Sequence, residues 1–568
     1  MRKIIFFLAV FESATGFGCF SQDTNLVTIP HGRIVSFGYA ASKIFPGTKR
    51  IITVYIPAQI DSSVPACVYV QQDGFFPEQK VNLTFDTLIA RKEIPVMVGV
   101  FVEPGNLPSL DSNTIGRPNR SFEYDGLGDT YARFLLEEIL PGVEKNCHLN
   151  LSKKGNDRCI AGLSSGGIAS FNVAWERPDA FTRVYCVSGS FVSFRGGNEF
   201  PTLVRKTEAK PIRAFLTTGT YDMENCAGKW TLLDMEMDKA LKFSGYDYKF
   251  LTLEGGHVVG WKEYFTEAMR FLWKDWPSPV KIGLSAPRVR DITLNGESWR
   301  VLKDHYNHIY GAATNAKGEV FFADASVDKI YRIALDGIVD EFISNAGFCN
   351  GLSFGAKDEL YTVSIKTGKI MCYETSGRKT QYADGINGRY VLARPDGGLY
   401  VTGQPGFSEI NQVWSIKDGK KTLMDDNLKF PTGIAMTPDK GFLTIAEKNS
   451  HSIYSYQIAP DGKLMNKERF FNLQVREQDD NAGTEAICYD REGHLYVATF
   501  AGIQVCAWDG PTQVILPLPS GHVTAMCFGG TGMDTLFAFC GDKIYMRKLK
   551  NHGIGAFSPW TAMKPGSL

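Results

Sequence analysis

Gly162-Leu163-Ser164-Ser165-Gly166-Gly167 is the stretch of this 568-residue chain that says most about its fold. The apolar run 158–161 before it is typical of a buried strand, and residues 168–175 after it predict a helix that ends before Pro178. A Gly-x-Ser-x-Gly sequence at such a strand–turn–helix junction lifts its serine hydroxyl clear of the sheet. The glycines permit the sharp turn. We therefore predict that Ser164 is a nucleophile; the alternative is a tight turn without chemistry.

The groups that would activate this serine follow it in the chain. A predicted strand at 215–219 leads to Asp222, and a second at 250–253 leads through two glycines to His257. The order serine, acid, histidine is that of hydrolases whose nucleophile lies on this kind of turn. His257 would take the proton of Ser164, and Asp222 would hold the imidazole in the required tautomer. Glu224, on the same loop, is the alternative acid.

Acyl transfer also needs backbone N–H groups that stabilise the oxyanion. We expect one from Ser165, directly after the nucleophile. The second is expected from Phe75 or Gly74, where the predicted strand 66–72 ends in an Asp-Gly turn. A plain turn at this position is the alternative.

Four residues are candidates for substrate binding. Trp230 and Trp261 follow the proposed acid and histidine, and either aromatic ring suits an acyl group or a sugar, although both also suit the core. Arg120 lies in a long polar loop and could hold a carboxylate, or could pair with Glu123 or Asp125 at the surface. Glu224 is the fourth candidate.

Residues 30–277 resemble the enterochelin-esterase and feruloyl-esterase-like branch of the α/β-hydrolases. The motifs that carry the resemblance, in chain order, are 44–50, 72–74, 102–105, 120–125, 138–141, the Ser164 turn, 219–222 and 255–257. The resemblance implies an α/β/α sandwich that hydrolyses carboxylic esters without a metal or an organic cofactor.

The chain changes character near 275–279, where prolines follow a predicted helix. Short β-rich runs alternate with turns from there on, and a turn followed by an aromatic strand recurs every 40 to 50 residues. The six copies begin at Lys317, Lys357, Asp396, Asp439, Glu492 and Gly532. This period is that of β-propeller blades, so we predict an all-β, six-bladed propeller.

Residues 281–550 resemble the gluconolactonase and senescence-marker-protein family, through motifs at 350–352, 431–435, 502–505 and 527–530. The resemblance implies one divalent cation in the central channel. The family's ligand positions fall here on Tyr310, the pair Arg389-Tyr390, Thr432 and Glu485. A hard cation needs six or more oxygen ligands, and Arg389 would repel it. We therefore expect no metal and no lactonase chemistry, although this channel mouth could bind a sugar.

Composition excludes several function classes. Lysine plus arginine and aspartate plus glutamate both number 61, so nothing favours a nucleic-acid or anionic-membrane partner. The 12 cysteines show no zinc-binding spacing. Cys147 and Cys159 flank a polar loop and are a candidate disulfide.

The N-terminus has the pattern of a signal peptide. A basic start at 1–3 precedes the apolar run 4–11, with small residues before Gln22. We expect export to the periplasm or the exterior, with lipidation at Cys19 as the alternative. No later run is long and apolar enough for a membrane helix.

The predicted organisation is a signal peptide at 1–21, an α/β-hydrolase domain at 22–277 and a propeller at 278–568. The predicted function is that of an exported serine esterase, without a cofactor, that acts on acylated carbohydrates or small esters. The propeller would assist substrate binding. Metal-dependent lactonase activity in the propeller and non-catalytic carbohydrate binding are the alternatives.

Overall fold

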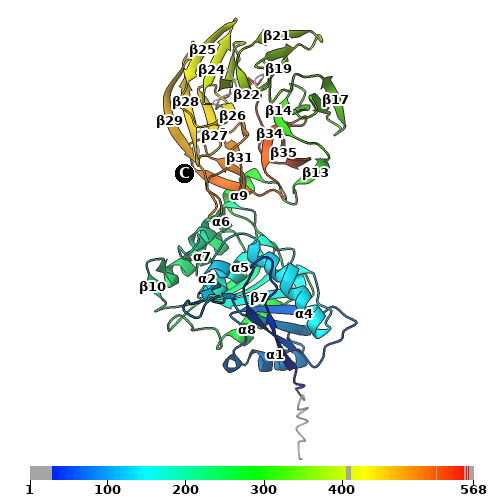
Figure 1. Ribbon diagram of the computed structural model, residues 1–568, viewed down its shortest axis with the longest axis vertical. Coiled ribbons are helices and arrows are strands. Elements are labelled where there is room, and N and C mark those ends of the chain that lie inside the picture. The colour runs from blue at the N-terminus through cyan, green and yellow to red at the C-terminus, as the bar shows by residue number, and fades with distance from the viewer. Residues whose placement is uncertain (1–28, 405–410, 520, 556–557, 560, 562–568) are drawn as a thin grey trace, which may run out of the picture.

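The computed structural model describes residues 29–404, 411–519, 521–555, 558, 559 and 561. The predicted signal peptide and Cys19 lie outside these residues. The chain forms an α/β domain followed by a propeller, and Figure 1 shows the propeller above the α/β domain. No described helix has the length and apolar character needed to span a bilayer.

The α/β domain is built on one eight-stranded sheet in the order β1-β2-β4-β3-β7-β8-β9-β12. These strands are β1 (Arg33–Tyr39), β2 (Arg50–Ile56), β3 (Cys67–Gln72), β4 (Met97–Val102), β7 (Arg158–Leu163), β8 (Arg183–Val187), β9 (Arg213–Gly219) and β12 (Asp247–Leu253). The first two strands join antiparallel, and all pairs from β4 to β12 are parallel. Two short ribbons accompany the sheet, β5 (Asn106–Leu107) with β6 (Arg117–Pro118) and β10 (Glu224–Asn225) with β11 (Gly228–Lys229).

Helices cover both faces of the sheet and bury two apolar clusters, so the predicted α/β/α sandwich is confirmed. They are α1 (Val81–Ala90), α2 (Arg120–Tyr124), α3 (Thr130–Arg133), α4 (Leu140–Cys147), α5 (Ser165–Glu176), α6 (Phe200–Lys206), α7 (Trp230–Phe243) and α8 (Phe265–Trp273). A π-helical turn at 134–139 links α3 to α4, and single 3-10 turns lie at 77–79, 155–157 and 197–199. The central strands are buried at almost every position, because helices cover both faces of the sheet.

The disulfide prediction is wrong. Cys147, at the end of α4, and Cys159, in β7, are both free and buried. Cys147 packs into the cluster on one face of the sheet and Cys159 into the other. The sheet therefore separates the two thiols that flank the polar loop.

The predicted six-bladed propeller is confirmed, with six four-stranded antiparallel sheets. Five blades are continuous in sequence: β14 (Ile309–Thr314) to β17 (Val339–Ser344), β18 (Gly351–Phe354) to β21 (Lys379–Ala383), β22 (Asn387–Ala393) to β25 (Lys420–Asp425), β26 (Pro431–Met436) to β29 (Leu464–Asn472), and β30 (Ile487–Tyr489) to β33 (Thr512–Leu516). The two middle strands of these five blades are, in chain order, β15 (Val320–Asp324), β16 (Lys329–Ile333), β19 (Leu360–Val363), β20 (Ile370–Tyr373), β23 (Leu399–Gln404), β24 (Val413–Lys417), β27 (Phe442–Glu447), β28 (Ser452–Ile458), β31 (Leu495–Thr499) and β32 (Gly502–Cys506).

The sixth blade closes the ring with strands from both ends of the domain. It contains β34 (Val523–Gly529), β35 (Thr535–Cys540) and β36 (Lys543–Lys548), and its outer strand is β13 (Arg300–Lys303). Before β13, helix α9 (Pro287–Ile292) packs into the core of these last blades. This closure ties the start of the propeller to its end and removes an open sheet edge.

The two domains meet through α6 and its flanks, which contact α9 and β33 of the propeller. Arg547 of β36 is buried and donates two hydrogen bonds to the Glu208 carboxylate, of 2.7 and 2.6 Å. Gln474, after β29, reaches Glu199 at 3.5 Å. The propeller therefore packs beside the loops of the α/β domain near residues 196–208.

Candidate active site

Ser164 lies on the sharp turn between β7 and α5. Its backbone has φ 61° and ψ −122°, a strained conformation for a residue other than glycine. A side chain at Gly162 would come within 2.1 Å of the Gly166 carbonyl oxygen, so strand and helix approach closely only because glycine is there. The turn leaves Ser164 half-buried at the carboxyl end of the parallel strands, where open α/β sheets place functional groups.

The amide of Ser165 is suited to hold an oxyanion. Ser164 is the N-cap of α5, so the first N–H groups of this 12-residue helix have no partner within it. The aligned peptide dipoles of the helix also favour negative charge at this end.

The second oxyanion amide can come from only one of the two residues expected from the sequence. The Gly74 N–H already donates to the Val102 carbonyl oxygen at 3.1 Å, which corrects its assignment. Phe75, with its ring 4.9 Å from that of Phe101, is the remaining candidate.

His257 and Asp222 are joined directly. The distance from Nδ1 of His257 to Oδ1 of Asp222 is 2.5 Å, and the Met223 amide donates to the same oxygen at 2.7 Å. The Asp222 side chain is fully buried, whereas that of His257 is 19% exposed. Burial alone would raise the pKa of Asp222, but the hydrogen bonds from His257 and Met223 hold that pKa below its usual value.

The loops that carry these two residues touch at a glycine. A side chain on Gly219, the last residue of β9, would lie 2.5 Å from the carbonyl oxygens of Gly255 and Gly256. Glu224 is different: it is exposed in the β10–β11 ribbon and pairs with Lys229 at 3.3 Å. The structure therefore corrects its assignment as the alternative acid, and its part in substrate binding stays a prediction.

Trp230 lies between Ser190, which contacts Ser164, and His257. Its Nε1 donates to Ser190 Oγ at 3.2 Å, and Ser190 Oγ lies 3.3 Å from Ser164 Oγ. Its ring meets the His257 ring edge-on, with centroids 5.9 Å apart. The Trp230 side chain is 0% exposed, so it cannot stack on a substrate as predicted. It contacts Ser190 and His257 instead.

Arg120 is held by an aspartate that lies far away in the sequence. Its guanidinium donates to both carboxylate oxygens of Asp73, at 2.6 and 2.9 Å, and to the Leu163 carbonyl oxygen at 3.3 Å. The alternative partners expected from the sequence are engaged elsewhere. Glu123 forms a buried ion pair with Arg50, at 2.6 Å, and Asp125 accepts a hydrogen bond from Ser165 Oγ at 3.2 Å.

A cavity of about 860 Å³ opens beside the turn. Its lining includes Leu163, directly before Ser164, Val258, directly after His257, and the Asp73–Arg120 pair. Trp261 also lines it, although most of this side chain is buried against Tyr185, with ring centroids 5.2 Å apart. Of the four predicted substrate-binding residues, the structure places Arg120 and Trp261 at the cavity.

Sequence reasoning missed Ser190 and Asp73. Ser190 follows β8 and Asp73 follows β3, so both stand at the carboxyl ends of parallel strands. That position is the signal that could have identified them. Asp73 lies in the 72–74 motif, to which the sequence assigned only a turn, and Ser190 lies in none of the motifs.

The mouth of the propeller channel brings together the positions expected for metal ligands, but not as a metal site. Both carboxylate oxygens of buried Glu485 are engaged by cations, Oε2 by Arg389 Nη2 at 2.9 Å and Oε1 by Lys448 Nζ at 2.8 Å. Thr432 is fully buried and donates to a backbone carbonyl. Within the described ranges, no three His, Cys, Asp or Glu side chains gather to hold an ion. These residues do not fit a divalent cation.

Comparisons with known protein families agree with the two-domain architecture. Residues 42–231 match the family model described as "Putative esterase", and residues 310–539 match the "SMP-30/Gluconolactonase/LRE-like region". The chain thus joins an esterase-like domain to a gluconolactonase-like propeller, as the sequence resemblances predict.

Individual relatives are distant. An uncharacterised protein of Bacillus subtilis is 26% identical over 25% of this chain and 57% of its own length. A gluconolactonase of Zymomonas mobilis is 24% identical over 36% of this chain and 64% of its own length. Among solved structures, the enterobactin esterase of Shigella flexneri is 18% identical, with a TM-score of 0.34, over 43% of this chain and 61% of its own. The chain therefore spans less than two thirds of each of these relatives.

Proposed function

We propose that this protein is a serine esterase that hydrolyses carboxylic esters through Ser164, His257 and Asp222. One observation carries the proposal: a serine on a strained strand–helix turn is linked through Ser190 and Trp230 to a histidine whose Nδ1 is bonded to a buried carboxylate. With Nδ1 held by Asp222, Nε2 is the ring nitrogen left to take the serine proton.

The reaction would proceed in two acyl-transfer steps. Ser164 Oγ attacks the ester carbonyl carbon while His257 accepts its proton, and the N–H groups of Ser165 and Phe75 stabilise the oxyanion. His257 then protonates the departing alcohol, and an acyl-enzyme remains. Water attacks this acyl-enzyme with His257 again as base, which releases the acid and restores the serine.

An apolar rim at the site supports an ester with an apolar or aromatic acyl group. We define this rim as Phe76, Tyr221, Met223 and Val258, all exposed large side chains. Tyr221 and Met223 flank Asp222 in sequence, Val258 follows His257, and Phe76 and Val258 line the cavity. Exposed apolar side chains grouped around a reactive centre are typical of a ligand-binding surface.

The alcohol portion of the substrate is proposed to be a carbohydrate. The cavity carries Glu78, Glu103 and Glu263 in addition to the Asp73–Arg120 pair. Carboxylates accept hydrogen bonds from hydroxyl groups and disfavour an anionic substrate. Export, with the N-terminal segment as a signal peptide, remains part of the proposal and is tested by the N-terminal sequence of the mature protein.

The experiment is hydrolysis of a panel of acetyl, feruloyl and methyl-glucuronoyl sugar esters, with gluconolactone alongside. Wild type and Ser164→Ala are compared with and without a chelator. The proposal expects ester turnover that Ser164→Ala abolishes and that the chelator leaves unchanged. Lactone turnover that survives Ser164→Ala but not the chelator would place the activity in the propeller and refute the proposal.

A further inference from the structure

The mouth of the propeller channel carries more positive than negative charge. The Glu485 carboxylate accepts contacts from two cationic side chains there, and its side chain is only 3% exposed. Arg389 and Lys448 each form an ion pair with it. Two cations therefore face one carboxylate, which leaves an excess of one positive charge on this group of three residues. Arg389 is 15% exposed and Lys448 40% exposed, so an anion can reach this excess charge from the Lys448 side.

Aromatic side chains surround these charges. The Arg389 guanidinium lies 5.6 Å from the centroid of the Tyr310 ring and 5.5 Å from that of Phe430. Lys448 lies 5.8 Å from the same Phe430 ring. Aromatic faces hold cations in place and also pack against the apolar faces of sugar rings.

The group also contains buried nitrogens without a partner. Neither Arg389 Nε nor His522 Nδ1 has a hydrogen-bond partner among the described residues, although both atoms are buried. His522 packs against Phe500, with ring centroids 4.9 Å apart, and interacts electrostatically with both Glu485 and Lys448. Buried polar atoms without partners are uncommon, and an oxygen atom of a ligand would satisfy the Arg389 Nε–H.

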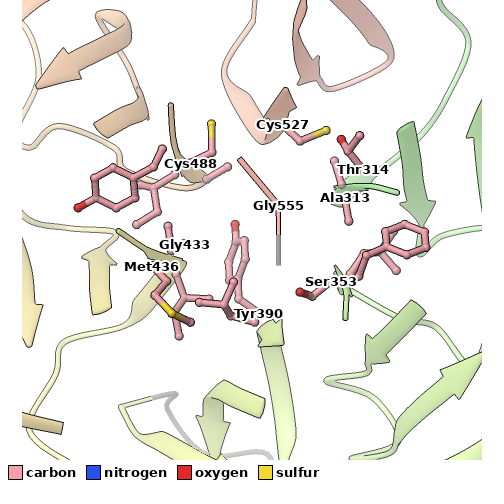
Figure 2. A pocket seen from close by; sticks show the side chains of 18 of the residues that line it. Ala313, Thr314, Ser353, Tyr390, Gly433, Met436, Cys488, Cys527 and Gly555 are labelled. Atoms are coloured by element: carbon pink, nitrogen blue, oxygen red, sulfur yellow. The ribbon is translucent and has the colours of Figure 1, made fainter. Parts of the chain in front are cut away.

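Tyr390 limits how far a ligand can enter. Its hydroxyl lies 3.5 Å from Glu485 Oε2 and 3.4 Å from the Thr524 carbonyl oxygen of another blade. Tyr390 also lines the central cavity, where Figure 2 shows it with Met436, Cys488 and Cys527. That cavity has only about 170 Å³, less than ligand sites usually offer, and its lining is mostly apolar. A charged ligand therefore does not suit this cavity, and the charged group that Tyr390 contacts at Glu485 is the better site for it.

From these contacts we infer that the channel mouth binds a sugar carboxylate, such as a hexuronate, in place of a metal ion. Lys448 and Arg389 bind the carboxylate of the ligand, and the Tyr310 and Phe430 rings contact the sugar. Lys448 is the most accessible of the charged groups, with 40% of its side chain exposed. The inference concerns the propeller alone and does not depend on the esterase proposal.

The test is calorimetric titration of the full-length protein with D-glucuronate, D-glucose and calcium chloride in turn. We expect glucuronate to bind at least tenfold more tightly than glucose, and calcium not to bind. Lys448→Met should weaken glucuronate binding about tenfold or more, in line with the loss of one charge-assisted contact. Because Lys448 is partly exposed, this variant should fold, and its thermal unfolding curve verifies this.

Lys463→Met is the matched control, since Lys463 is an exposed propeller lysine that pairs with Asp461. It should bind glucuronate as wild type does. Equal affinities for glucuronate and glucose, stoichiometric calcium binding, or equal loss in Lys448→Met and Lys463→Met would each overturn the inference. None of these results bears on hydrolysis at Ser164, so the two proposals fail separately.

Discussion

The imidazole of His257 lies 2.5 Å from the carboxylate of Asp222, although the two residues are 35 positions apart in the chain. The contact forms at the point where the loops after β9 and β12 touch across Gly219. Asp222 is buried and bonded, whereas Glu224, two residues further on, is exposed and paired with a lysine. The geometry thus distinguishes two neighbouring acids that the sequence left as alternatives.

This distinction predicts a large difference between two single substitutions. Asp222→Asn should lower kcat about 10⁴-fold, because the amide favours the wrong histidine tautomer. Glu224→Gln should change kcat less than about twofold, because loss of an exposed ion pair has little effect. Steady-state ester hydrolysis by both variants checks this. A comparable loss in the two variants would contradict the assignment.

The lowered pKa of Asp222 predicts how stability depends on pH. Because the folded protein holds this carboxylate ionised more strongly than the unfolded chain does, its ionisation stabilises the fold above its usual pKa of 3.8. That contribution is lost as the pH falls through the lowered value. Denaturant unfolding should therefore show a stability difference between wild type and Asp222→Asn that is constant above about pH 5 and shrinks below about pH 3. A stability difference that widened in acid would contradict the lowered pKa of Asp222.

Trp230 should affect catalysis without touching the substrate. Trp230→Phe keeps an aromatic ring beside His257 but removes the hydrogen bond to Ser190. We expect kcat to fall by about tenfold with KM nearly unchanged, because an interaction that positions the catalytic groups is lost. Ser190→Ala should have a similar effect on kcat. A rise in KM alone would instead indicate that Trp230 contacts the substrate.

The Arg547–Glu208 pair should couple the two domains. Arg547→Met leaves the Glu208 carboxylate without its bidentate partner at a buried contact and should destabilise the interface by about 1–3 kcal/mol. Calorimetry should then resolve two unfolding transitions further apart than in wild type. Arg300→Met, which removes an exposed pair with Glu297 at 3.9 Å, is the matched control. Identical curves for the two variants would contradict the coupling.

Much of this architecture could be predicted because local sequence signals agree with it. The Ser164 turn needs glycines at fixed positions, and the blades repeat a turn and an aromatic strand, so both features are visible in single segments. The Asp222–His257 contact was predictable from the order of the residues in the chain, whereas other contacts between distant segments were not. The Asp73–Arg120 pair spans 47 residues, and the closure of the ring by β13 depends on the whole propeller.

Trp230 was misassigned for a related reason. A tryptophan near a catalytic loop suits either a binding surface or a core, and only its position at the start of α7 decides between them. Cys147 and Cys159 likewise flank one loop in sequence but lie on opposite faces of the sheet. Sequence proximity does not specify the face on which a side chain lies.

The central claim is that Ser164 is the nucleophile of this protein, and covalent labelling tests it most directly. The intact full-length protein is treated with a fluorophosphonate, and its mass and labelled peptide are measured. We expect one adduct on Ser164 in wild type and in Ser165→Ala, and none in Ser164→Ala. An adduct that persists in Ser164→Ala, or ester hydrolysis by wild type that continues without any adduct, would contradict the account.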